Sequence, residues 1–256
     1  MKTNYHTHTF RCRHATGTER EYLENALKAG FSVFGFSDHT PYPFENGYCS
    51  PFRMHVEEAA DYFDTIRRLR EEYRGRLEIP VGVEAEYYPA YFDGLLRMLR
   101  KNGCEYLLLG QHYLQNELGA AYSGSMTRDD DILRTYVRQT TEALKTGLFS
   151  CFAHPDLLYY RGSAEVYRRE MTALCEAAAR EHVPLEFNLL GFGQGRGYPY
   201  LPFWRIVAEV GNEVVIGCDA HSPEAVRCGV LRRQAEEYLA GLGLKPKEIL
   251  TLRPLG

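Results

Sequence analysis

Histidine and acidic side chains recur along this sequence at spacings that suit metal binding. His6 and His8 lie two residues apart near the N-terminus, and Asp219 and His221 repeat that spacing near the C-terminus. Five further candidate ligands stand between these pairs, namely His14, His39, Glu84, His112 and His154. Imidazole and carboxylate ligands together suit Zn, Mn or Fe ions. So many ligands exceed the needs of one four-coordinate ion, so we expect two or three divalent ions.

Ions held this close together predict hydrolytic chemistry. A divalent ion lowers the pKa of bound water enough to supply hydroxide near neutral pH, and a neighbouring ion can hold a substrate oxygen. Any one of these histidines, taken alone, is more often a packed or surface residue than a ligand. The metal-site interpretation therefore depends on whether the fold brings the candidates together.

Short apolar runs alternate with amphipathic segments along the whole chain. Apolar runs predict buried strands at about residues 3–7, 32–37, 79–84, 105–110, 149–153, 184–188 and 213–218. Apolar residues at helical spacing predict helices at about residues 18–29, 54–74, 90–101, 128–146, 164–181, 202–210 and 222–239. This alternation is typical of a parallel α/β architecture, and it leaves open whether the sheet is a closed barrel or an open one. The glycine-rich segment 191–195 is interpreted as a flexible loop that could contact phosphate.

The candidate ligands follow or end the predicted strands. His6 and His8 end the first strand, Glu84 ends the third, and His154 follows the fifth. In an α/β barrel the C-terminal ends of all strands meet at one mouth, where active sites are built. Residues far apart in the sequence would then converge on one metal site.

The overall composition is that of a folded protein without a strong charge bias. The chain has 256 residues, a formal net charge of -4 and 45% hydrophobic residues, which suits one large domain or two small ones. The weakly acidic balance argues against a nucleic-acid polymer as partner. No apolar run approaches the roughly 18 residues of a membrane span, so we expect no membrane association. The oligomeric state is left open.

Cysteine usage indicates a reducing compartment. There is no Cys-x-x-Cys pair, and the N-terminus has no apolar signal-peptide core. We therefore expect a cytoplasmic protein whose thiols are free. The seven cysteines are Cys12, Cys49, Cys104, Cys151, Cys175, Cys218 and Cys228.

The sequence resembles the PHP (polymerase and histidinol phosphatase) superfamily in several motifs. These are His6-Thr7-His8 with Cys12-Arg13-His14 and Gly17-Thr18, then Ser37-Asp38-His39, Gly82-Val83-Glu84, His112, His154-Pro155-Asp156 and Asp219-Ala220-His221. The likeness spans residues 1 to about 230 and is greatest to the histidinol-phosphatase branch. It implies a single PHP-type domain over residues 1–256, folded as a distorted seven-stranded TIM-like barrel. It also implies a trinuclear metal centre at the C-terminal ends of the strands.

The resemblance further implies how the ligands are shared among three ions. The first ion would be held by His6, His8, Glu84 and Asp219. Glu84 would bridge to a second ion held by His112 and His154, and the third would be held by His14, His39 and His221. One departure concerns strand four, where many relatives place Ser and an aliphatic residue before the histidine and this chain has Gly110-Gln111.

Catalytic and substrate-binding roles are implied for a few residues. The implied catalytic residues are Glu84, His154 and Asp219, with Asp38 either orienting a ligand histidine or acting as the leaving-group acid. Arg161 and Arg196 lie in the loops after strands five and six, where relatives place phosphate-binding arginines, and guanidinium matches phosphate oxygens in a two-pronged fashion. Two loops could cover the pocket and contact an imidazole or amine, namely 40–53 with Tyr42, Phe44 and Tyr48, and 113–127 with Glu117 and Tyr122.

The activity implied by the resemblance is hydrolysis of L-histidinol phosphate in histidine biosynthesis. A metal-bridging hydroxide would attack phosphorus in this small phosphate ester. One alternative is a phosphoesterase of the same superfamily that acts on nucleotides or another small ester. The other is a non-catalytic, metal-stabilised partner domain; such domains tend to lose ligands, whereas this chain keeps the full set.

Overall fold

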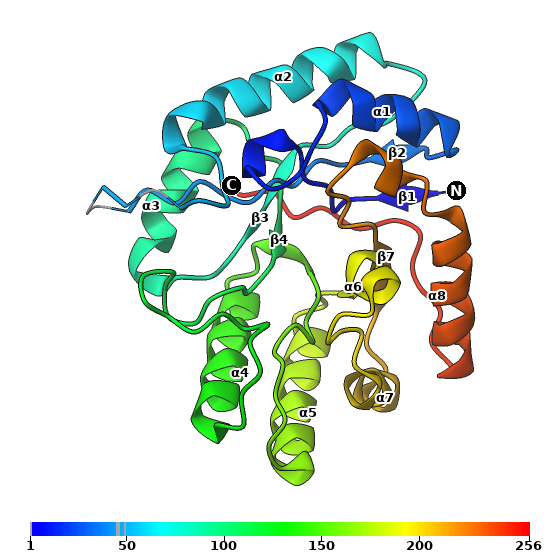
Figure 1. Ribbon diagram of the computed structural model, residues 1–256. Coiled ribbons are helices and arrows are strands. Elements are labelled where there is room, and N and C mark those ends of the chain that lie inside the picture. The colour runs from blue at the N-terminus through cyan, green and yellow to red at the C-terminus, as the bar shows by residue number, and fades with distance from the viewer. Residues whose placement is uncertain (1, 45–46, 49) are drawn as a thin grey trace.

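The architecture is a parallel α/β fold, seen in a computed structural model that describes residues 2–44, 47–48 and 50–256. One strand forms in each predicted run: β1 (Thr3–Asn4), β2 (Val33–Phe34), β3 (Gly82–Ala85), β4 (Tyr106–Leu109), β5 (Phe149–Phe152), β6 (Leu185–Asn188) and β7 (Val214–Gly217). They pair in parallel as a two-stranded sheet, β1-β2, and a five-stranded sheet, β3-β4-β5-β6-β7. The strands lie centrally with helices around them (Figure 1). The predicted parallel α/β architecture is confirmed.

Isolated bridges extend the pairing beyond the two sheets. Thr7 pairs with Ala220, which joins the chain after β1 to the chain after β7. Phe36 pairs with Val81, which joins the chain after β2 to the segment that leads into β3. Both bridges are parallel. Each edge strand of the larger sheet is therefore adjacent to a strand of the smaller one.

Helices connect the strands and pack outside them. Those in the described ranges are α1 (Glu19–Lys28), α2 (Ala59–Glu72), α3 (Pro89–Lys101), α4 (Asp130–Lys145), α5 (Ala164–Arg180), α6 (Leu189–Gln194), α7 (Leu201–Val210) and α8 (Gly229–Gly241), with 3-10 turns η1 (Phe10–Cys12), η2 (Val56–Glu58) and η3 (Pro223–Val226). Local capping explains where several begin. Asp129 and Ser163 accept hydrogen bonds from backbone N–H groups of the first turns of α4 and α5. Thr18 and Glu21 form a capping box at α1.

The glycine-rich segment 191–195 is not the flexible loop that we expected, because most of it belongs to α6. Asn188 caps this helix by accepting from Gly191 N at 3.0 Å. A Cβ at Gly191 would lie 2.2 Å from the Tyr198 ring, so glycine serves close packing at this position rather than flexibility.

The helix predicted at about residues 222–239 is divided into η3 and α8. Ser222 caps η3 and Pro223 occupies its first position, as the sequence predicts. The backbone of Arg227 then leaves the helical region with ψ at 42°, so α8 begins separately at Gly229.

The strands of the larger sheet are apolar on both faces. Leu107 and Leu109 of β4 belong to the large core between strands and helices, whereas Tyr106 and Leu108 join a second cluster. That smaller cluster also contains Cys151, Ala153, Val215 and Leu250. Because successive side chains of a strand point to opposite faces, the second cluster lies on the face turned away from the helices. Burial on both faces explains why the sequence shows continuous apolar runs instead of alternation.

The C-terminal segment crosses the starts of the strands. Lys247 N donates to Val214 O at the start of β7 at 2.7 Å, and Arg253 N donates to Ser150 Oγ of β5 at 2.9 Å. Main chain therefore covers this end of the sheet. The predicted site residues lie at the opposite, C-terminal ends of the strands.

Six cysteines in the described ranges are free, as expected, and all six are buried, while Cys49 lies outside the described residues. Within the same ranges, none of the helices combines the length and apolar character that a bilayer crossing requires.

Candidate metal centre

The ends of β1 and β7 bring together two histidines and an acid. The Nε2 atoms of His6 and His8 lie 3.1 Å apart, and Asp219 Oδ1 lies 3.5 Å and 3.2 Å from them. All three side chains are buried. His6 and His8 are two residues apart in an extended segment, which turns both rings to the same side.

Glu84 of β3 lies at the centre of the cluster. Its Oε1 lies 2.7 Å from His154 Nε2 and 3.5 Å from His112 Nε2. Its Oε2 lies 3.1 Å from His39 Nδ1 and 3.4 Å from His8 Nε2. One carboxylate thus faces imidazoles that follow four other strands, which is the arrangement of a bridging ligand.

A third group, His14, His39 and His221, lies nearer the solvent. The ring nitrogens of these residues lie within 4.8 Å of one another, and the Nε2 atoms of His14 and His221 are 3.1 Å apart. Nδ1 of His14 lies 2.8 Å from Cys12 O, and Nδ1 of His221 lies 3.0 Å from Asp219 O. Because each Nδ1–H is donated to a carbonyl, each Nε2 is left with a lone pair for an ion.

Several buried polar atoms in this cluster have no hydrogen-bond partner. Among them are His39 Nδ1, Glu84 Oε2 and Asp219 Oδ1. A buried carboxylate oxygen without a donor is costly. Divalent cations between these oxygens and the facing imidazoles would satisfy both, so the residues present fit a group of metal ions.

The charges of the cluster move the pKa values of its members apart. Burial alone would lower the pKa of His8, but Asp219 and Asp38 raise it to about 9. Burial alone would raise the pKa values of Glu84 and Asp219, but the surrounding imidazoles hold both well below their usual range. For His221 burial dominates and lowers the pKa to about 4. The acids therefore stay ionised, and their charge suits bound cations.

Two carboxylates outside the predicted set orient ligand rings. Glu186 Oε1 lies 2.8 Å from His6 Nδ1, and Glu86 Oε1 lies 2.9 Å from His112 Nδ1. A carboxylate on Nδ1 fixes the tautomer and turns Nε2 towards the metal site. The sequence did carry a signal for both acids, because Glu186 interrupts an apolar strand and Glu86 follows Glu84 at the two-residue spacing of one strand face.

The cluster forms the floor of a cavity of about 270 Å³. Seven of the predicted ligands line it, namely His14, His39, Glu84, His112, His154, Asp219 and His221. The remaining lining residues are Phe52, Tyr113, Tyr122, Leu157, Leu190, Arg196 and Tyr198. Both loops of undetermined role, 40–53 and 113–127, therefore contribute aromatic rings to the cavity wall. Tyr42 and Phe44 pack in the hydrophobic core instead.

Four predicted site residues do not line this cavity, namely His6, His8, Asp38 and Arg161. Arg161 lies at a neighbouring cavity of about 350 Å³, where its guanidinium rests over the rings of Tyr159 and Tyr200 at 4.6 Å and 5.1 Å. Asp38 is fully buried, with Oδ1 3.7 Å from His8 Nδ1. The structure thus places Asp38 next to a ligand and Arg161 beside the cavity.

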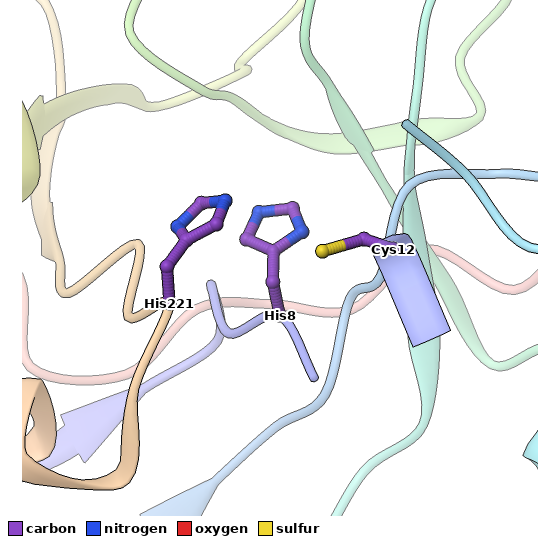
Figure 2. Close-up of side chains that lie close together, drawn as sticks. All are labelled: His8, Cys12 and His221. Carbon is purple, nitrogen blue, oxygen red and sulfur yellow. The ribbon is translucent and has the colours of Figure 1, made fainter. Parts of the chain in front are cut away.

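Cys12 also lies next to the cluster. Figure 2 shows the His8 ring between the Cys12 thiol and the His221 ring, and the potential ligand atoms of the three residues lie within 4.8 Å of one another. Cys12 is completely buried, and burial raises the pKa of its thiol. Because metals bind the thiolate, we interpret Cys12 as a packing residue.

Comparisons with known proteins identify the family of the chain. The PHP domain family matches residues 4–189. The probable histidinol-phosphatase of Deinococcus radiodurans is 33% identical over 230 residues, which cover 86% of each chain. The probable histidinol-phosphatase of Schizosaccharomyces pombe is 22% identical over 95% of this chain and 88% of that protein.

The fold itself is shared with a solved structure. Histidinol phosphate phosphatase from Lactococcus lactis, complexed with zinc, L-histidinol and phosphate, matches with a TM-score of 0.75 and 17% identity, over 99% of this chain and 97% of that one. The resemblance found in the motifs is thereby confirmed, and the chain belongs to the PHP domain family.

Proposed function

We propose that the chain is a metal-dependent phosphomonoesterase that hydrolyses L-histidinol phosphate to L-histidinol and phosphate. The observation that carries the proposal is the cavity in which seven predicted ligands and Arg196 face one another. The relatives named above support the substrate, since two of them are probable histidinol-phosphatases and the solved histidinol phosphate phosphatase is complexed with zinc, L-histidinol and phosphate.

We assign the ligands to three ions. One would be held by His6, His8, Glu84 and Asp219, a second by Glu84, His112 and His154, and a third by His14, His39 and His221. Zn, Mn and Fe all suit this set of donors. When bound, such ions lower the pKa of water towards neutrality and offset the charge on phosphate oxygens.

The chain's own residues would bind and orient the substrate. Arg196 is an exposed lining residue of the cavity, and its guanidinium can donate two hydrogen bonds to phosphate oxygens. The rings of Phe52 and Tyr113 are stacked, with centroids 5.6 Å apart, and offer an aromatic wall for an imidazole ring. Asp38 faces His8 Nδ1, whereas His8 Nε2 faces the cluster, so the ring separates Asp38 from the ions. We therefore assign Asp38 to orienting His8 rather than to protonating the leaving group.

We assign Arg161 as a second phosphate-binding residue that contributes less to phosphate binding than Arg196. Its guanidinium would have to leave the rings of Tyr159 and Tyr200 to reach the cavity, and that stacking is favourable. Arg196 needs no such displacement.

At the level of the fold, we propose one distorted seven-stranded TIM-like barrel and one PHP-type domain over residues 1–256. The parallel bridges at both junctions of the two sheets support the barrel. The single domain is supported by the C-terminal residues, since Arg100 of α3 donates to Leu255 O at 2.9 Å. The free thiols suit a reducing compartment, and we place the chain in the cytoplasm.

A phosphate-release assay on metal-analysed protein tests the function. The substrates are L-histidinol phosphate, nucleoside monophosphates and p-nitrophenyl phosphate, and we expect the highest kcat/KM for L-histidinol phosphate. Rapid hydrolysis of nucleotides with L-histidinol phosphate left intact would reassign the substrate and keep the chemistry. If fully metal-loaded protein releases phosphate from none of them, the enzyme proposal fails and the non-catalytic alternative takes its place.

A further inference from the structure

Arg53, on the loop between β2 and η2, is a buried cation next to the metal cluster. It is 1% exposed. Its Nη1 and Nη2 donate to the two carboxylate oxygens of Glu86 at 3.1 Å and 2.9 Å, and its Nε donates to Glu117 Oε2 at 3.1 Å. Nη1 also donates to Thr40 O at 2.8 Å. One guanidinium thus joins the chain after β2, the end of β3 and the loop after β4.

The local charge balance makes Arg53 necessary to both acids. Glu86 and Glu117 are both buried, and Arg53 is the cation that they share. Burial alone would raise the pKa of Glu86, but Arg53 and His112 lower it. Removing the cation would leave two buried carboxylates facing each other, which proteins tolerate poorly.

Glu86 connects Arg53 to His112, a predicted metal ligand. Its Oε1 accepts from Arg53 and lies 2.9 Å from His112 Nδ1, while His112 Nε2 lies 3.5 Å from Glu84 Oε1. The backbone of His112 is held by hydrogen bonds from His112 N to Gly110 O at 3.1 Å and from Ser123 N to His112 O at 2.7 Å, but these bonds do not set the orientation of the ring. The carboxylate on Nδ1 is what directs Nε2 into the metal cluster.

The same guanidinium supports the aromatic wall of the cavity. Arg53 Cζ lies 4.5 Å from the centroid of the Phe52 ring, which stacks on Tyr113. Glu117, held by Arg53, also accepts from Tyr48 OH at 2.9 Å. The 40–53 and 113–127 loops are therefore tied together at Arg53.

We propose that Arg53 is a positioning residue that couples metal binding to the order of the two loops. Through Glu86 it holds His112 in its metal-binding orientation. Through Glu117 and Phe52 it holds the 40–53 and 113–127 loops together as one wall of the cavity. The inference rests on the proposed function only in requiring an ion at His112, and it deepens that proposal by linking one ion to the substrate-facing loops.

Metal retention and kinetics of Arg53→Lys, Arg53→Met and Glu86→Gln test the proposal. After dialysis against a competing chelator, we expect each variant to bind the ion at His112 about 10- to 100-fold more weakly. Arg53→Lys keeps the charge but loses the two-pronged hydrogen bonding of the guanidinium, so its metal affinity should lie between those of the original chain and of Arg53→Met. The visible spectrum of cobalt-substituted protein should change with Arg53→Lys, because the environment of one ion is altered. The KM for substrate should rise in both Arg53 variants.

Arg70→Met is the matched control. Arg70 also forks onto one carboxylate, that of Glu105, at 2.7 Å and 2.8 Å, and also donates to a backbone carbonyl, that of Ile79. It does not line the central cavity. We expect this variant to keep the metal content, the cobalt spectrum and the KM of the original chain.

A double-variant cycle keeps the test decisive if Arg53→Met fails to fold. If Arg53 acts through Glu86, adding Arg53→Lys to Glu86→Gln should weaken metal retention little beyond the single changes. Additive losses of metal affinity in the double variant would overturn the proposal. Folded Arg53 variants with unchanged metal content and an unchanged cobalt spectrum would also overturn it, as would an original chain that retains no ion. Because metal retention needs no substrate, the inference can stand even if no phosphate ester is hydrolysed.

Discussion

The carboxylate of Glu84 occupies the space that a side chain at Gly110 would fill. A Cβ added at Gly110 would lie 2.0 Å from Glu84 Oε1, the oxygen that lies 2.7 Å from His154 Nε2. The departure from the family pattern before His112 therefore has a steric consequence. Glycine at this position lets the central carboxylate approach β4 closely.

We expect Gly110→Ala to displace Glu84 and to disturb the metal centre without unfolding the protein. A displacement of about 1 Å at a catalytic group can cost roughly 100-fold in rate, and we expect a fall in kcat/KM of that order together with loss of metal. Metal analysis and steady-state kinetics check this. Gly94→Ala is the control, because a Cβ there meets its nearest neighbour at an ordinary 3.7 Å. Unchanged metal content in Gly110→Ala would show that Glu84 can shift and still bind its ions.

Glu186 is expected to govern the binding of the ion at His6. Glu186 Oε1 lies 2.8 Å from His6 Nδ1, and its Oε2 accepts from His154 N at 3.1 Å. Glu186→Gln removes the charge that fixes the His6 tautomer, so metal affinity should fall about 10- to 100-fold. A metal titration monitored by a competing chelator measures this.

The control for that change is Glu213→Gln. Glu213 pairs with Lys247 where both side chains are about half exposed, and such surface pairs contribute little. Equal metal affinity in Glu186→Gln and Glu213→Gln would mean that the His6 ring is oriented without Glu186.

The convergence of the candidate ligands could be predicted from the sequence because each carries a distinctive side chain and most of them end or follow a recognisable strand. The sequence marked the orienting acids but not their partners, since Glu186 of β6 reaches His6 across β7, which lies between β6 and the chain that follows β1. The helix α6 was missed for another reason. Its glycines suggested flexibility, but Gly191 is needed because the Tyr198 ring occupies the position of a Cβ. The orientation of Arg161 depends on stacking with Tyr200, which sequence spacing does not show.

Arg196→Ala should impair substrate binding more than Arg161→Ala. A hydrogen bond to a charged group contributes about 1.5–3 kcal/mol, so losing the contacts of Arg196 should lower kcat/KM by about 10- to 100-fold. Arg161 lies at the neighbouring cavity and should have a smaller effect. Kinetics with L-histidinol phosphate and inhibition by inorganic phosphate measure both changes. Arg205→Ala, at the same neighbouring cavity, is the control. A larger loss in Arg161→Ala would reverse the ranking and show that Arg161 moves to the phosphate.

Metal binding should release protons and become tighter as pH rises. In the metal-free protein Asp219 and Asp38, acting against burial, raise the pKa of His8 to about 9, so the ring is protonated near neutral pH. A metal ion binds only the neutral ring, so loading at about pH 7.5 must displace that proton. Calorimetry in buffers of different ionisation enthalpy should show net proton release. Heats that do not depend on the buffer would contradict the protonated state of His8.

The same shift predicts different pH profiles of stability with and without metal. The pKa of His8 is higher in the folded chain than the ordinary value of 6.5, so the protonated ring stabilises the metal-free fold below pH 6.5. That contribution is lost as pH rises through about 9. In the metal-loaded protein the affinity gained over this interval offsets that loss, because His8 is neutral both in the ion-bound fold and in the unfolded chain, so the melting temperature should change little there. Melting temperatures measured with zinc and with chelator should therefore diverge between pH 6.5 and about 9. Parallel curves would mean that protons and ions do not compete for His8.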